Sequence, residues 1–277
     1  MMKVAYTCWT WINANNAVTG RSQLEQALKE IKSLGYDYVE FFASISSFYD
    51  DPNDLVALTK KYNINLCNLY GFFGLDVDAV ITYGKKQIDF LAAIGGKWYN
   101  CSNGLFSDNG PWERPSNYEM LDKTCYIADT LGKYALERGV KLCFHPHYGT
   151  YVISQSDIDY FLAHTDPNYV FMCIDTAQTV LAGIRPLDLI RQCGSRIAYM
   201  HLKDVDTYAL SKAAAGPEKM ATVRALGHGT LNFPEVKATL EEIGYDGILC
   251  VELEYPEVCN YHSAEVSRTY LHDVLGL

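Results

Sequence analysis

The sequence predicts an α/β protein, a (β/α)₈ TIM barrel in which residues 1–277 form a single domain. Eight short runs rich in β-branched and aromatic residues alternate with longer segments of helical periodicity. The length of 277 residues is close to the roughly 250 of a typical barrel of this kind. Apolar residues make up 49% of the chain, so a large core can be built.

The alternation begins with a strand near the N-terminus and ends with a helix. The predicted strands are 4–8, 38–42, 64–69, 98–101, 141–144, 170–174, 197–202 and 248–253. The predicted helices are 21–34, 52–62, 76–94, 116–138, 155–164, 186–193, 233–243 and 263–275. In the first helix Leu24, Leu28 and Ile31 recur at helical spacing, and Gly35 follows as a stop signal. The segment 233–243 repeats this pattern before Gly244.

Eight such units also suit an open doubly wound sheet, which is the alternative to a closed barrel. An open sheet that binds a dinucleotide would have a G-x-G-x-x-G run after its first strand. Here Trp9, Trp11 and Asn13 follow instead, and the count of eight favours closure. The segment 203–231 is longer than a typical connection and is expected to cover the active site.

Composition narrows the class of partner. The formal net charge is −10, and the longest basic clusters are pairs of lysines, which argues against nucleic acid as a partner. The chain lacks the apolar stretch of a signal peptide or of a membrane-spanning helix. Nine cysteines without a Cys-x-x-Cys pair predict free thiols in a reducing, cytoplasmic compartment. A homo-oligomer is possible, but no interface can be identified.

Ionisable residues gather at the ends of the later strands. His145, Asp175, His201 and Glu252 each follow an apolar run, and a carboxylate in such a place must be paired, hydrogen-bonded or bound to a metal. The C-terminal ends of barrel strands carry the chemistry of this fold. Two imidazoles and two carboxylates that meet there predict a site for one divalent ion, with Mn, Zn, Co, Fe and Mg all permitted.

Simpler roles remain open for the same residues. A single histidine after a strand is often only hydrogen-bonded within a loop. Asp175 is a favourable N-cap for a following helix. Glu252 is a possible structural ion-pair partner of Lys203. One metal site explains all four residues at adjacent strand ends with a single hypothesis, whereas the simpler roles need a separate explanation for each residue.

At these residues the sequence resembles the xylose isomerase-like barrel family, which includes sugar isomerases, ketose 3-epimerases, inosose dehydratase and endonuclease IV. The resemblance covers nearly the whole chain. It is carried by the stretches HPHYGT at 145–150, IDTAQ at 174–178, HLKD at 201–204, LGHG at 226–229 and VELE at 251–254. The HPHYGT stretch looks most like the inosose dehydratase branch.

The resemblance implies metal ligands after strands five to eight, commonly Glu, Asp, His and Glu. Asp175, His201 and Glu252 match three of these positions, whereas His145 stands where many members have Glu. Gln178 is a second departure, because many members have His there. Endonuclease IV has further histidines that this chain lacks after strands three and four, so a DNA-repair site is disfavoured.

The reaction that the resemblance implies is proton removal next to a carbonyl, through a metal-stabilised enediolate. Glu252 is the first candidate base and Glu254 the second, while His147 and Lys203 are further catalytic candidates. Expected contacts to a sugar or polyol come from the following set: Trp9, Glu40, Tyr70, His228 and Glu254.

The function expected first is a sugar or polyol isomerase or epimerase. The alternative is a lyase of the inosose dehydratase kind, which the two histidines of the HPHYGT stretch favour. A non-catalytic carbohydrate-binding barrel is a third hypothesis, and a DNA-acting hydrolase is a fourth. The fate of the enolate separates the first two, and the sequence does not determine it.

Overall fold

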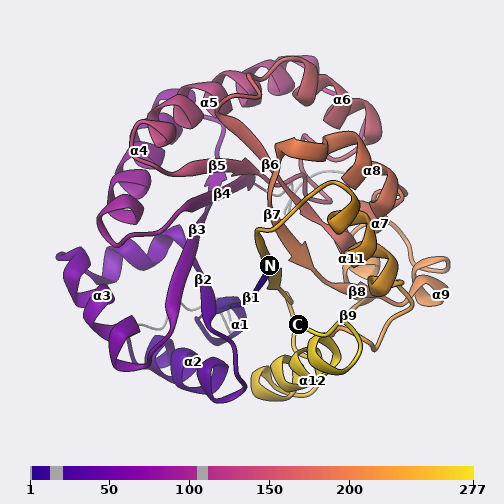
Figure 1. Cartoon of the computed structure of the whole chain (residues 1–277). Helices are drawn as coiled ribbons and strands as arrows, with labels where there is room; N and C mark the ends of the chain where they lie inside the picture. Colours follow the sequence, from indigo (N-terminus) through magenta and orange to yellow (C-terminus); the bar gives the residue numbers. More distant parts are fainter. Residues whose placement is uncertain (1, 13–20, 105–111) are drawn as a thin grey trace.

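The computed structural model describes residues 2–12, 21–104 and 112–277. Eight parallel strands form a closed barrel in the order β1-β10-β7-β6-β5-β4-β3-β2, with helices around the outside (Figure 1), which confirms the predicted fold class. The barrel strands are β1 (Lys3–Thr7), β2 (Tyr38–Phe42), β3 (Asn65–Phe73), β4 (Trp98–Asn103), β5 (Lys141–Phe144), β6 (Val170–Asp175), β7 (Ile197–Leu202) and β10 (Ile248–Val251).

Eight longer helices follow the strands, within a few residues of the predicted ranges. They are α2 (Arg21–Ser33), α3 (Pro52–Lys61), α4 (Val77–Ala93), α5 (Tyr118–Leu136), α6 (Gln155–Ala163), α8 (Pro186–Cys193), α11 (Phe233–Glu242) and α12 (Asn260–Asp273). Polar caps set several of their starts: the side chains of Asp76, Asn117 and Ser154 accept hydrogen bonds from backbone N–H groups of the first turn.

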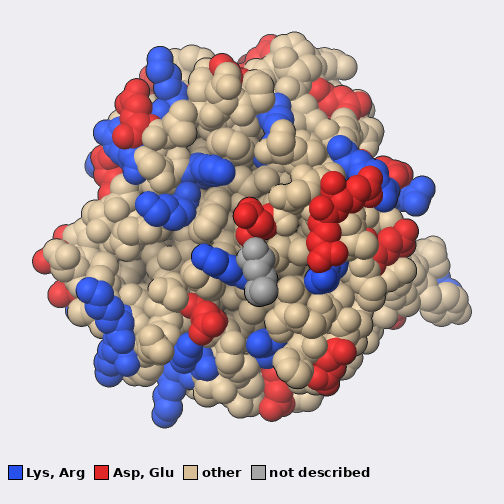
Figure 2. All heavy atoms as spheres, in the orientation of Figure 1, with Lys and Arg blue, Asp and Glu red and all other residues tan. Residues whose placement is uncertain are grey.

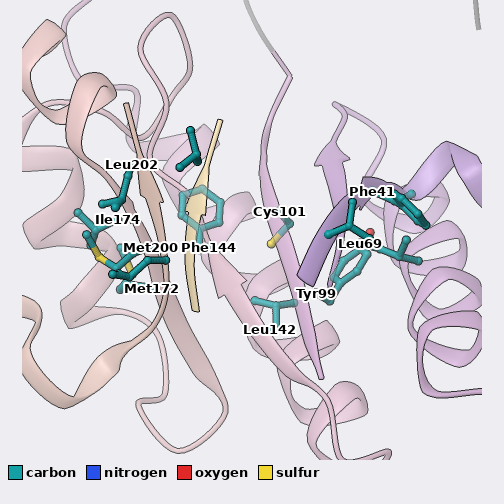
Figure 3. Packing of buried hydrophobic residues seen from close by; sticks show 14 of the residues in the cluster. Phe41, Leu69, Tyr99, Cys101, Leu142, Phe144, Met172, Ile174, Met200 and Leu202 are labelled. Carbon is teal, nitrogen blue, oxygen red and sulfur yellow. The ribbon is translucent and has the colours of Figure 1, made fainter. Parts of the chain in front are cut away.

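Side chains along the barrel strands alternate between its two faces. Met172 and Ile174 of β6 pack with Met200 and Leu202 of β7 in the layer between barrel and helices, as Figure 3 shows. The intervening residues, such as Cys173, belong to the barrel interior. Because the side-chain period of a strand is two, the next inward positions along β6 and β7 are Asp175, His201 and the residue after β7, Lys203.

The structure adds elements that the sequence analysis missed. Two of them are short helices directly after strands: α1 (Trp9–Ile12) and α7 (Thr176–Leu181). Strand β3 also runs on to Phe73, because its partner β4 continues beside it to Asn103.

The segment 203–231 is folded rather than an open loop. It contains an antiparallel pair, β8 (Asp204–Val205) with β9 (Val223–Arg224), and the short helices α9 (Thr207–Leu210) and α10 (Pro217–Met220). The reason is the buried carboxylate of Asp204, which accepts four backbone hydrogen bonds of 2.8–3.0 Å from Val205, Gly227, Gly229 and Leu231. The glycines allow this approach, since a Cβ on Gly229 would lie 2.3 Å from Asp204 Oδ1.

Charges of both signs are mixed on the surface. On the face drawn in Figure 2, Lys and Arg side chains are interspersed with Asp and Glu side chains. Among the helices in the described part of the chain, none has the length and apolar character needed to cross a bilayer.

The contact between α5 and the start of β6 yields a stability prediction. A Cβ on Gly132 would lie 2.6 Å from the carbonyl oxygen of Tyr169, which cannot rotate away as a side chain would. Alanine is otherwise favoured over glycine in a helix by about 1 kcal/mol. We nevertheless expect Gly132→Ala to lower the free energy of unfolding by about 1–3 kcal/mol in urea denaturation.

Tyr126→Ala on the exposed side of the same helix is the control, with an expected change within about 0.5 kcal/mol. A Gly132→Ala protein as stable as the parent would show that α5 moves away from β6 at little cost.

Candidate metal centre

Four side chains from the ends of four strands meet inside the mouth of the barrel. His145 follows β5, Asp175 ends β6, His201 lies in β7 and Glu252 follows β10. Asp175 Oδ2 lies 3.5 Å from His145 Nε2 and 3.8 Å from His201 Nδ1, and His201 Nδ1 lies 2.9 Å from Glu252 Oε2. The residues expected to form the metal site therefore share one location.

The atoms that face one another in this cluster are buried and have no hydrogen-bond partner among the described residues: His145 Nε2, Asp175 Oδ2, His201 Nδ1 and Glu252 Oε2. Ligand atoms of His145, Asp175 and His201 lie within 4.8 Å of one another. Buried polar atoms without partners are costly, and a cation bound between them removes that cost. The donor set of imidazole nitrogens and carboxylate oxygens thus fits a divalent metal ion.

Each imidazole of the cluster has a partner on the ring nitrogen that does not face the other ligands. The hydroxyl of Tyr70 lies 2.7 Å from His145 Nδ1, and the carboxylate of Glu40 lies 3.0 and 3.1 Å from His201 Nε2. Asn68 and Asn100 donate hydrogen bonds to Glu40 Oε2. A partner on one ring nitrogen fixes the ring and leaves the other nitrogen for a metal.

This arrangement differs from the sugar contacts that the sequence suggested for two of these residues. Glu40 is fully buried and Tyr70 is 4% exposed, and their polar atoms are engaged by the two imidazoles. Asn68 and Asn100 are polar residues near strand ends to which the sequence assigned no role, and both point inward to Glu40. Their inward position on the strands was the feature of the sequence that could have indicated this role.

Asp175 has two tasks, one for each oxygen. Its Oδ1 accepts hydrogen bonds from the backbone N–H groups of Ala177 and Gln178 and so caps α7. Its Oδ2 faces the two imidazoles. The capping role and the ligand role are therefore compatible, because each uses a different atom.

Lys203 places one positive charge inside the cluster. Its side chain is fully buried, and Nζ lies 3.2 Å from Asp175 Oδ2, 3.0 Å from Glu252 Oε2 and 2.5 Å from Glu254 Oε1. Asp204, its neighbour in sequence, is committed to the backbone of the segment 203–231 and is not its partner. Lys203 is thus bound to three carboxylates at once.

Glu254 is held by one oxygen only. Its Oε1 accepts hydrogen bonds from Lys203 and, at 3.0 Å, from Gln178 Nε2, whereas its buried Oε2 has no hydrogen-bond partner among the described residues. Gln178 Oε1 in turn accepts a hydrogen bond from the backbone N–H of Tyr148. Gln178, which departs from the family pattern, therefore orients a carboxylate.

The ionisation of the cluster follows from burial and charge. Burial lowers the pKa of His145, and burial with the nearby His145 and Lys203 lowers the pKa of His147 to about 3. Burial acts to raise the pKa of Asp175, but the Lys203 ammonium outweighs it and holds that pKa well below its usual value. His147 is therefore a neutral imidazole; its Nδ1 lies 2.7 Å from the carbonyl oxygen of Tyr148, and its Nε2 faces Glu254 at 3.9 Å.

The pKa of His201 is shifted in the opposite direction from those of His145 and His147. Burial acts to lower its pKa, but Cys173 and the carboxylates of Glu40 and Glu252 hold the pKa well above its usual value. Without a metal, a proton on His201 and the ammonium of Lys203 supply the positive charge that the carboxylates require. A metal bound at Nδ1 would displace that proton.

The two remaining candidate residues have partners other than the four predicted ligands. The ring of Trp9 packs on Phe42 with centroids 4.0 Å apart, and Phe42 packs on Tyr70 and Phe72. This aromatic group stands over β2 and β3. His228 is exposed in the segment 203–231 and pairs with Glu257 at 2.7 Å, rather than with a residue of the cluster.

Comparison with known proteins agrees with this architecture. The family model for the xylose isomerase-like TIM barrel matches residues 28–271. An inosose dehydratase of Clostridium botulinum (strain Alaska E43 / Type E3) is 28% identical over 273 residues, which cover 90% of this chain and 89% of that protein.

Two solved structures share the fold. The IOLI protein, solved with a zinc atom, has a TM-score of 0.77 and 18% identity, and the match covers 99% of this chain and 98% of that one. An L-ribulose 3-epimerase has a TM-score of 0.75 and 16% identity, with coverage of 98% and 93%. At such identities the structural likeness shows the fold alone. The family model, in contrast, spans most of the sequence, and the chain belongs to the xylose isomerase-like TIM barrel family.

Proposed function

We propose that this protein is a metal-dependent sugar or polyol isomerase or epimerase that removes a proton from a carbon next to a carbonyl group. The observation that carries the proposal is the convergence of four buried ligand atoms, from His145, Asp175, His201 and Glu252. None of them has a hydrogen-bond partner among the described residues, although the Lys203 ammonium lies near the two carboxylate oxygens. A divalent ion held by them would supply a Lewis acid that polarises the carbonyl. The names of the relatives support a sugar or polyol as the substrate class.

The proton acceptor that fits the geometry best is Glu254. One of its oxygens is anchored by Lys203 and Gln178, and the other is buried without a hydrogen-bond partner among the described residues. Glu252 was the first candidate from the sequence, but its Oε2 is close to both His201 and Lys203. We therefore assign Glu252 to the metal and Glu254 to the proton.

Two further residues complete the proposed site. The neutral imidazole of His147, with Nε2 facing Glu254, is the second candidate for proton transfer, but its pKa of about 3 makes it a weaker proton acceptor than Glu254. The ammonium of Lys203 stabilises negative charge that develops on the substrate beside Glu252 and Glu254. The aromatic group of Trp9, Phe42 and Phe72 offers an apolar surface for the C–H face of a sugar ring.

A dehydratase is the second candidate, and one specific observation favours it. The relative named inosose dehydratase matches 90% of this chain. The two reactions share the proton removal and differ in the next step, because a dehydratase expels a β-hydroxyl as water. His147 or Lys203 would then have to donate a proton to the leaving oxygen, and Lys203 carries one.

The metal ligands can be tested by direct metal analysis of purified protein. We expect His201→Ala and Glu252→Ala to lose bound metal while circular dichroism shows an intact fold, because each change removes a ligand atom. His164→Ala and Glu242→Ala remove the same residue types from exposed positions and should keep the metal of the parent. Metal content that is unchanged in both ligand variants would refute the proposed site.

Glu40 and Tyr70, which orient the two imidazoles, yield a prediction about metal affinity. Glu40→Gln keeps the size of the side chain but removes the charge that orients His201, and we expect metal affinity to fall about 10- to 100-fold. Tyr70→Phe should act in the same direction through His145. Isothermal titration with Mn²⁺ or Zn²⁺ measures both, and an unchanged dissociation constant in both variants would contradict the orienting role.

The reaction class can be tested by incubation with ketoses and inososes in D₂O. An isomerase or epimerase should place deuterium on a substrate carbon and leave the mass otherwise unchanged, whereas a dehydratase should form a product lighter by one water. Glu254→Gln should reduce either turnover by about 10²- to 10⁴-fold, the usual contribution of a general base. Binding of these compounds with neither outcome would favour a non-catalytic sugar-binding barrel.

A further inference from the structure

Lys203 makes two contacts that its proposed roles beside Glu254 and the substrate do not explain. Its ammonium contacts Asp175 Oδ2 at 3.2 Å and Glu252 Oε2 at 3.0 Å, and these are the same oxygens that are assigned to the metal. A metal and an ammonium thus compete for two carboxylate oxygens. We propose that Lys203 is a built-in counter-cation, which neutralises the carboxylates when no metal is bound and weakens the binding of a divalent ion. This inference rests on the proposed metal site.

The lysine cannot leave the site to relieve this competition. Its side chain is fully buried. Its backbone is fixed to the start of α7, since Lys203 N–H donates to Thr176 Oγ1 at 3.0 Å and Thr176 Oγ1 donates to Lys203 O at 2.7 Å. The third contact, to Glu254 Oε1, involves a carboxylate outside the ligand set. When a metal takes Asp175 and Glu252, the ammonium keeps Glu254 and remains a fixed neighbour of the ion.

The charges decide the direction of the effect. Removing the ammonium leaves the carboxylates of Asp175, Glu252 and Glu254 without their positive partner, so the metal-free protein loses stability. The same change removes the repulsion between a monovalent and a divalent cation a few ångströms apart in a poorly solvated site. Both effects favour the metal-bound form. A lysine that merely held the ligands in place would have the opposite effect, because its loss would weaken metal binding.

The experiment titrates chelator-treated full-length protein with Mn²⁺ or Zn²⁺ alone, and the readout is the dissociation constant. We expect Lys203→Met, which keeps the length of the side chain, to bind at least about tenfold more tightly than the parent. Lys203→Arg keeps the charge and should not tighten binding. The control is Lys219→Met, which removes a lysine that pairs with a single carboxylate, Glu113, away from the cluster, and it should bind as the parent does.

Thermal denaturation supplies a second readout that does not require activity. The melting temperature of Lys203→Met should lie below that of the parent without metal, and should rise more than that of the parent when metal is added. If Lys203→Met does not fold without metal, Lys203→Gln is used as well. Folding of either variant on addition of Mn²⁺ would support the proposal, because the ion then replaces the ammonium.

The outcomes separate the two proposals. A parent protein that binds no divalent ion would defeat the metal site itself. A parent that binds metal, with Lys203→Met binding equally or more weakly, would overturn only the counter-cation role. Variants at Lys203 that stay unfolded even with saturating metal would also overturn it, because ammonium and metal would then not be interchangeable.

Discussion

The structure depends on one constraint, the need for positive charge at the centre of the barrel mouth. The carboxylates of Glu40, Asp175 and Glu252 are at least nine-tenths buried, and Glu254 is nearly so. Carboxylates removed from water need a cation or hydrogen-bond donors close by. Lys203 and a proton on His201 supply positive charge in the structure, and the metal of the proposed function would supply more. If the proposed metal binds, the occupancy of this cluster and the stability of the barrel are expected to be linked.

In each central side chain one polar atom faces the cluster, and a second polar atom is held by a hydrogen-bond partner that fixes the orientation of the side chain. Asp175 caps α7 through Oδ1 and presents Oδ2 to the cluster. His145 is oriented by Tyr70 and His201 by Glu40, and each ring presents its second nitrogen. Glu254 follows the same rule, with Oε1 anchored and Oε2 without a hydrogen-bond partner. Such division of tasks makes a preorganised site out of rigid strands instead of mobile loops.

Much of this could be predicted from the sequence because it depends on local periodicity. The alternation of strands and helices indicated the barrel, and polar residues at the ends of apolar runs indicated His145, Asp175, His201 and Glu252. The partners across the barrel could not be predicted. Glu40 meets His201 across 161 residues of sequence, and Tyr70 meets His145 across 75. Strand register and the inward direction of each side chain set those contacts, and no local pattern encodes them. The fold of the segment 203–231 likewise depends on a single buried carboxylate, Asp204, whose four backbone partners lie up to 27 residues away.

The histidine at position 145 connects the electrostatics with the chemistry. A glutamate there, which is common in the family pattern, would add one more negative charge to a cluster in which Lys203 already contacts three carboxylates. A neutral imidazole, kept neutral by burial, would serve as the proposed metal ligand without that charge. Histidine at position 145 also means that no carboxylate at this strand end is available to exchange a proton with a substrate. Under the proposed function, proton transfer would rest on groups beside the metal, and the residues proposed for it are Glu254, anchored by Lys203, and the neutral His147 that faces it. The loss of one carboxylate and the presence of a buried lysine are therefore two parts of the same charge balance.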